Sequence, residues 1–91
     1  MKYEYPAVIS YSTNDEVYYV EFPDISGCFT DGKTLHEALD NAQDALRTML
    51  SYYEFQGKAT SVPSSLNSIS LGIGEIAALI TTETDDKEKI A

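Results

Sequence analysis

The chain has 91 residues, with 6 Lys or Arg against 15 Asp or Glu and a formal net charge of −9. A chain of this length forms one domain with a modest core, and its acidic composition disfavours direct nucleic-acid binding, because Lys and Arg supply most of the affinity for a phosphate backbone. The single cysteine, Cys28, excludes an internal disulfide and a multi-cysteine zinc site. The first residues contain no apolar signal segment, and no run approaches the roughly 18 apolar residues of a membrane span, so we expect a cytoplasmic protein.

Residues 5–22 have the composition of a β-hairpin. Two runs rich in Val, Ile, Tyr and Phe flank the polar stretch 12–16, in which Asn14 and Asp15 tolerate positive φ and are expected to form a two-residue turn. A slip of one residue would mix apolar and polar positions on both faces, so a single covering layer selects the register set by this turn. The predicted core face consists of Ala7, Ile9, Tyr11, Tyr18, Val20 and Phe22. The mixed opposite face carries Glu4, Pro6, Val8, Ser10, Ser12, Val17, Tyr19 and Glu21.

A short third strand follows the hairpin. Residues 23–27 have turn chemistry, because Pro23 sets φ and Gly27 permits positive φ. Residues 28–30 are long enough for a strand before Asp31 and Gly32, so the sheet is expected to continue as an antiparallel meander.

One long helix is predicted after the third strand. Thr34 and Glu37 form a capping box at its start. Apolar residues then recur at spacings of three and four from Leu35 to Tyr53, giving one apolar stripe over about five turns. Gly57 supplies a stop signal, so we expect the helix to end near Phe55.

The last third of the chain is less regular. Residues 59–74 are Ser-rich and predict an ordered loop, whereas residues 75–82 form a short apolar run typical of a buried strand. From residue 83 the sequence is polar, so we expect residues 83–91 to form an acidic, flexible tail. The order of elements (βββαβ) predicts a two-layer α+β domain over residues 1–82. Its second sheet face has no covering segment in this prediction, which favours a partner or a second copy there, and we expect a homodimer or higher oligomer.

Several stretches of the sequence resemble the HicB antitoxin family. They are residues 5–9, residues 18–32 and the beginning of the helix at residues 34–42. The most specific part is Phe22-Pro23-Asp24, then Gly27-Cys28, with Thr30-Asp31-Gly32 directly behind. Pro63-Ser64-Ser65-Leu66 is similar to the proline-serine loop that follows the helix in those proteins. The resemblance covers roughly residues 3–82.

This resemblance implies a partial ribonuclease-H-like fold without the nuclease site, acting as the antitoxin of a two-component module. Such antitoxins bind HicA, a small basic toxin of double-stranded-RNA-binding-like fold that cleaves messenger RNA with a catalytic histidine. Family members commonly carry a C-terminal DNA-binding domain, and this sequence has an acidic stretch up to Ala91 where that domain would start, so a short form is expected. The net charge of −9 supports a basic partner independently of the resemblance, because an acidic chain attracts a basic one.

Structural explanations fit the chemically active residues better than catalytic ones. His36 lies in the first helical turn with no legible nucleophile, and Cys28 on a predicted strand is typical of a small buried hydrophobe. A two-metal nuclease would need strand carboxylates to converge, whereas two of the four lie in turn sequences where Asp forms local hydrogen bonds. These four are Glu4, Glu21, Asp24 and Asp31. We therefore expect a non-enzymatic protein with no catalytic, metal-binding or cofactor-binding residue.

The sequence thus predicts a binding protein that neutralises a HicA-type mRNA-cleaving toxin by covering its active surface. Tyrosine is enriched at interface hot spots and carboxylates complement a basic partner. The expected contacts are the acidic and aromatic positions around the signature turn: Tyr19, Glu21, Asp24 and Asp31.

Two alternatives stay open at the level of sequence. The chain could be a free-standing oligomeric HicB-like domain with a direct RNA-binding or assembly role and no toxin partner. Its seven tyrosines suit base stacking, but its six basic residues are spread along the chain and predict no basic groove. The acidic side of the helix, Glu37, Asp40 and Asp44, fits either a solvated face or a docking patch for a basic partner.

Overall fold

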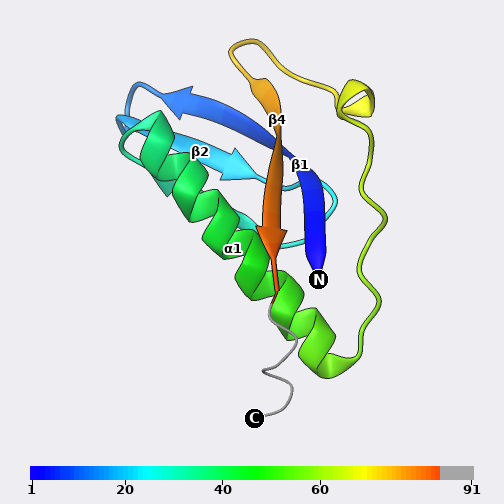
Figure 1. The fold of residues 1–91 in the computed structure, drawn as a ribbon. Coiled ribbons are helices and arrows are strands. Elements are labelled where there is room, and N and C mark those ends of the chain that lie inside the picture. The colour runs from blue at the N-terminus through cyan, green and yellow to red at the C-terminus, as the bar shows by residue number, and fades with distance from the viewer. Residues whose placement is uncertain (85–91) are drawn as a thin grey trace.

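A computed structural model describes residues 1–84 of the chain. These residues form β1 (Lys2–Ser12), β2 (Val17–Glu21), β3 (Phe29–Gly32), α1 (Leu35–Gln56), the single 3-10 turn η1 (Leu66–Ser68) and β4 (Ile76–Glu83). The strands make one antiparallel sheet in the order β3-β2-β1-β4, and α1 lies across one face of it (Figure 1). The predicted two-layer α+β architecture is confirmed, with β4 returning from the helix to pair beside β1.

The hairpin of β1 and β2 has the register expected from the sequence. Ile9 pairs with Val20 and Tyr11 pairs with Tyr18. The turn differs from the prediction, because the loop spans residues 13–16 and the positive φ, 55°, falls on Glu16 rather than on the Asn-Asp pair. The amide of Asp15 donates to the Ser12 hydroxyl at 3.1 Å, which stabilises this wider loop.

The caps of α1 follow the sequence signals. The Thr34 hydroxyl accepts a hydrogen bond from the amide of Glu37 at 3.0 Å, and the Glu37 carboxylate accepts one from the amide of Lys33 at 2.7 Å. At the other end Gly57 takes a φ of 71°, so the helix ends at Gln56, one residue beyond the expected position.

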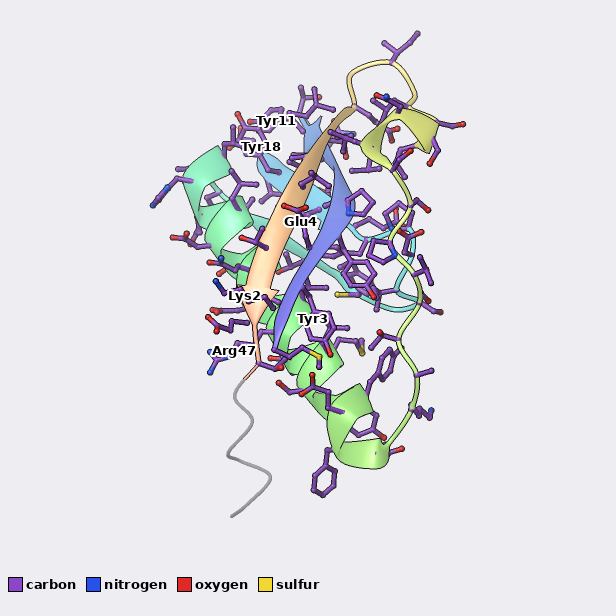
Figure 2. All side chains as sticks on the ribbon, turned by 45° about the vertical axis from the view of Figure 1, so that its right-hand side comes forward. Lys2, Tyr3, Glu4, Tyr11, Tyr18 and Arg47 are labelled. Carbon is purple, nitrogen blue, oxygen red and sulfur yellow. The ribbon has the colours of Figure 1, made fainter. Side chains whose placement is uncertain are left out.

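The core lies between α1 and the face of the sheet that the alternation predicted. The helix buries Ala38, Ala42, Leu46 and Leu50 against Tyr5, Ala7, Ile9, Val20, Phe22 and Ile80. Tyr11 departs from the prediction, because it is 49% exposed at the turn end of this face. Its ring lies 4.8 Å from that of the half-buried Tyr18, centroid to centroid, so the two rings cover each other there (Figure 2).

The prediction that nothing in the chain covers the second sheet face is wrong for one part of that face. Residues 57–75 leave the C-terminal end of α1 and return to the start of β4 along one side of the sheet (Figure 1). The Tyr5 side chain belongs to the core face, and its hydroxyl donates to the carbonyl of Ser61, which ties the loop to the sheet. On the second face, Ile69 of the loop lines the same hollow as Val8. Pro6 is fully buried on this face. The loop therefore shields the β1 side of the second face and leaves the β2 and β3 side exposed.

The N-terminus and the end of β4 are joined. Thr84 exchanges two main-chain hydrogen bonds with Met1, each 2.9 Å long, and its hydroxyl donates to the Glu54 carboxylate of α1 at 2.9 Å. Of the tail expected over residues 83–91, residues 85–91 lie outside the described part of the chain, whereas Glu83 is the last residue of β4. No helix formed by residues 1–84 is long and apolar enough to cross a membrane.

Candidate interaction site on the open sheet face

Most residues of the signature segment around the β2–β3 turn have a structural role. Phe22 and Cys28 are buried in the core. Gly27 has a φ of 78°, which side chains with a Cβ rarely adopt. A Cβ on Gly32 would lie 2.4 Å from the backbone nitrogen of Ala38, so β3 approaches the start of α1 this closely only with glycine. The exposed side chains of the segment have no such role in packing, so they are the candidates for function.

Asp24 proves to be an anchor for the long loop. One carboxylate oxygen accepts a hydrogen bond from the amide of Ser64 at 2.8 Å, and the other accepts one from its hydroxyl, also at 2.8 Å. Asp24 is only partly exposed and lies in the turn after β2 rather than on the sheet. The structure therefore gives this predicted contact residue a positioning role, and its contact role stays a prediction.

The other three predicted contacts share one surface. Tyr19 pairs with Asp31, and Glu21 pairs with Phe29 on the neighbouring strand. Because alternate residues of a strand point to opposite faces, all four side chains project away from α1. We call this surface, formed by Tyr19, Glu21, Phe29 and Asp31, the open face. Tyr19 is 41% exposed and Phe29 is 69% exposed.

The open face is acidic and aromatic. Both of its carboxylates are exposed, and residues 17–31 contain no Lys or Arg. The Tyr19 hydroxyl donates to the Asp15 carboxylate at 2.6 Å, and this hydrogen bond, with smaller contributions from desolvation and from the charges of Asp15 and Asp31, raises the pKa of Tyr19. Tyr19 is therefore a neutral ring held by the loop of the hairpin.

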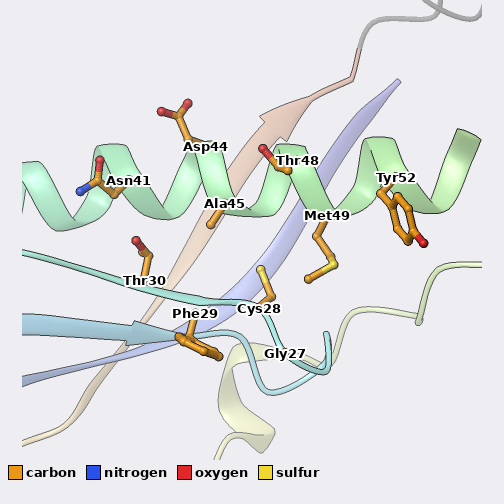
Figure 3. Close-up of a pocket in the computed structure, with 10 residues that line it drawn as sticks. All are labelled: Gly27, Cys28, Phe29, Thr30, Asn41, Asp44, Ala45, Thr48, Met49 and Tyr52. Atoms are coloured by element: carbon orange, nitrogen blue, oxygen red, sulfur yellow. The ribbon is translucent and has the colours of Figure 1, made fainter.

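Sequence reasoning missed Phe29 and the groove beside it. The groove runs between β3 and α1, and its wall on the helix side includes Ala45, Met49 and Tyr52 (Figure 3). The side chain of Phe29 points away from α1 in the same view, whereas Cys28 faces the helix. The sequence held one signal for an exposed Phe29, because neighbouring residues of a strand point to opposite faces and Cys28 was expected to be buried. The predicted strand of three residues was too short to show this alternation clearly.

The residues considered as metal ligands, general base and nucleophile have the following surroundings within residues 1–84. Within residues 1–84 no group of three or more His, Cys, Asp or Glu side chains is placed to hold a metal ion. His36 is exposed and lies 3.4 Å from Asp40, Nε2 to Oδ2, one helical turn away. Burial raises the pKa of the Cys28 thiol to about 11, so the thiol is protonated at neutral pH and is a weak nucleophile.

The family described as the HicB_like antitoxin of bacterial toxin-antitoxin systems matches residues 5–83. The chain belongs to this family. Antitoxin HicB of Escherichia coli (strain K12) is 41% identical over 51 residues, which are 56% of this chain and 37% of that protein. The UPF0150 protein Ta0767 of Thermoplasma acidophilum is 44% identical over 50 residues, covering 55% of this chain and 68% of that protein. The chain therefore aligns with little more than a third of the length of E. coli HicB.

Solved structures share the HicB-like fold. A toxin-antitoxin complex from Streptococcus pneumoniae contains a chain with a TM-score of 0.84 and 23% identity, covering 91% of this chain and 70% of that chain. The N-terminal domain of Burkholderia pseudomallei antitoxin HicB has a TM-score of 0.72 and 24% identity, and the match covers 86% of this chain and 95% of that one. A chain of the HicA3 and HicB3 toxin-antitoxin complex has a TM-score of 0.69 and 25% identity, and the match covers 91% of this chain and 99% of that one. The fold described above is thus one found in toxin-antitoxin complexes.

Proposed function

We propose that this HicB-like chain is a non-enzymatic antitoxin that binds a small, basic, mRNA-cleaving HicA-type toxin and neutralises it by covering its active surface. Membership of the antitoxin family supports an antitoxin role. The similar chain in the HicA3 and HicB3 complex supports a toxin of the HicA type as partner. A cytoplasmic location, where such a toxin meets messenger RNA, is part of this proposal.

The open face is the observation that carries the proposal. It joins two exposed aromatic side chains to two exposed carboxylates, and no basic residue occurs between residues 17 and 31. Aromatic side chains supply the desolvated anchors of an interface, while the surrounding charges raise the association rate with a partner of opposite charge. A protein surface that binds RNA phosphates is basic, so this acidic face is suited to cover it.

Calorimetric titration with the protein encoded by the adjacent reading frame, which the proposal expects to be a HicA-type toxin, tests the proposal. We expect a tight complex that weakens as salt is raised and in which the toxin no longer cleaves RNA. Glu21→Lys and Asp31→Lys should each weaken binding by about tenfold or more, since charge reversal in an interface costs more than about 1.4 kcal/mol. Asp40→Lys makes the same charge change on the exposed side of α1 and serves as the matched control.

The outcomes separate the open face from its alternatives. If Asp40→Lys weakens binding and the open-face variants do not, the acidic side of α1 is the docking surface. If the chain binds no toxin and self-associates, the antitoxin proposal is wrong and an assembly role replaces it. A homodimer or higher oligomer is compatible with the proposal, and light scattering of the free chain and of the complex measures it.

A further inference from the structure

Beside the open face, β3 has an outer edge whose main-chain groups point away from the sheet. The amide of Phe22 donates to the carbonyl of Cys28 at 3.0 Å, which fixes the phase of the β2–β3 ladder. Because hydrogen-bonded residues alternate along an antiparallel pair, Thr30 points its main-chain groups toward β2, and Phe29 and Asp31 point theirs outward. The side-chain amide of Asn41 donates to the Asp31 carbonyl at 2.9 Å and so occupies one of these groups. Within residues 1–84, the N–H and C=O of Phe29 and the N–H of Asp31 are left for an added strand.

The groove between this edge and α1 is apolar on the helix side. Cys28 is buried at its floor, Met49 is half-buried on its wall, and Tyr52 is 52% exposed at its rim. Asp44 lies on the same rim, and no Lys or Arg lines the groove. A strand added to β3 would place alternate side chains into this groove and onto the open face, so one segment would contact both surfaces.

The opposite edge of the sheet, β4, also has outward main-chain groups but lacks the apolar groove and the cation-free rim. The side-chain amide of Gln43 donates to the Thr81 carbonyl at 2.7 Å, so α1 occupies one outward carbonyl of β4 as Asn41 does on β3. The hollow beside β4 is lined by polar and charged residues, including Lys2, Glu4 and Glu83. Within residues 1–84, only the β3 edge therefore combines outward main-chain groups, an apolar groove and an acidic rim free of cations.

We propose that the β3 edge accepts an extended segment of the basic toxin. An apolar side chain of this segment enters the groove against Met49 and Tyr52. The basic residue next to it faces Asp31 on the open face, and a basic residue two positions away faces Asp44 on the groove rim. This inference rests on the proposed antitoxin function and adds the mode of binding, strand addition. The occupant follows from charge complementarity, since the rim and the open face carry carboxylates and no cation.

A proline scan of the two edges tests strand addition. Phe29→Pro removes an outward N–H without removing a β2–β3 hydrogen bond, and Phe29→Ala removes the same ring while keeping that N–H. We expect Phe29→Pro to bind the toxin about five- to tenfold more weakly than Phe29→Ala, as the loss of one interfacial hydrogen bond predicts. Leu79→Pro and Leu79→Ala, the matched pair at the outward edge of β4, should bind equally well.

Tyr52→Ala keeps the test independent of any proline variant that fails to fold. This side chain is 52% exposed, and its removal should leave the thermal midpoint unchanged while weakening toxin binding about fivefold or more. If Phe29→Pro binds as Phe29→Ala does and Tyr52→Ala binds as the unmodified chain does, strand addition is overturned although toxin binding stands. If the unmodified chain binds no toxin, the proposed function itself fails.

Discussion

The two faces of the sheet use aromatic side chains in opposite ways. Phe22 follows β2 and is 2% exposed beneath α1, whereas Phe29 begins β3 and is 69% exposed on the open face. The two residues lie seven positions apart in one signature segment. A single stretch of sequence therefore builds the core with one set of side chains and exposes the alternate set on the open face.

The sharpest contrast is expected from the two phenylalanines. Phe22→Ala should lower the free energy of unfolding by about 3–5 kcal/mol, because it leaves a cavity in the core. Phe29→Ala should change it by less than about 0.5 kcal/mol, since its ring is exposed. Urea unfolding of both variants measures the difference, and equal losses would show that the open face is packed rather than free.

Glycine substitutions test the approach of β3 to α1. Gly32→Ala should destabilise the fold by about 1–3 kcal/mol, because its methyl group would overlap the main chain of Ala38. Gly72→Ala is the control, since the nearest atom to its Cβ is a Glu75 carboxylate oxygen at 3.4 Å. Thermal unfolding compares them, and a Gly32→Ala variant as stable as the unmodified chain would contradict the close approach.

The hydrogen bonds between Asp24 and Ser64 hold the loop of residues 57–75 beside the turn that follows β2. Asp24→Ala should lower the free energy of unfolding by about 1.5 kcal/mol, because it removes both hydrogen bonds to Ser64. Ser64→Ala removes only the hydroxyl hydrogen bond, so it should add little once Asp24 is absent. A double-mutant cycle measures this coupling. Toxin binding by Asp24→Asn should stay near that of the unmodified chain if Asp24 positions the loop, and a loss as large as that of Asp31→Lys would restore Asp24 as a contact.

Cys28 belongs to the helix-covered face and should titrate as a buried thiol. Its folded pKa of about 11 lies above the ordinary value near 9.0, so the fold favours the neutral thiol. Its contribution to stability is therefore complete below pH 9 and is lost as the pH rises through 11. Cys28→Ala should remove this part of the alkaline loss, and rapid labelling of the native thiol at pH 8 would contradict its burial.

The smallest effect is expected on the open face, at Tyr19. Asp15 raises the pKa of this hydroxyl through their hydrogen bond, so Asp15→Asn should move the pKa back toward its ordinary value of 10.0. Ultraviolet titration of the phenolate absorbance follows the change, with Tyr19→Phe identifying the transition. An unchanged Tyr19 titration in Asp15→Asn would show that the hydrogen bond is absent in solution.

The features of the fold that depend on residues close in the sequence were predicted correctly. The hairpin register, the helix and its Thr34 cap follow from alternation, periodicity and capping chemistry, and the structure has all three. The course of residues 57–75 was not predictable, because it depends on hydrogen bonds between residues about 40 or more positions apart, such as Asp24 with Ser64.

Part of the candidate site could also be predicted from short-range patterns in the sequence, and part of it could not. Tyr19 and Glu21 were predicted to share a face because a strand register decides which side chains do so. Asp24 and Asp31 were both expected in turns and were grouped with them by their positions in the sequence. The structure instead places Asp31 in β3 opposite Tyr19, whereas Asp24 is bonded to Ser64 of the folded loop. The groove beside Phe29 involves α1 as well as β3, so no single segment of the sequence displays it.

Nuclear magnetic resonance titration of the isotopically labelled chain with the basic toxin tests most directly whether the open face and the β3 edge form the interface. We predict that the amide signals perturbed most strongly belong to residues 17–21 and 28–31, together with the groove residues of α1. Perturbations confined to residues 57–75, or to the side of α1 that carries Glu37 and Asp40, would contradict this assignment.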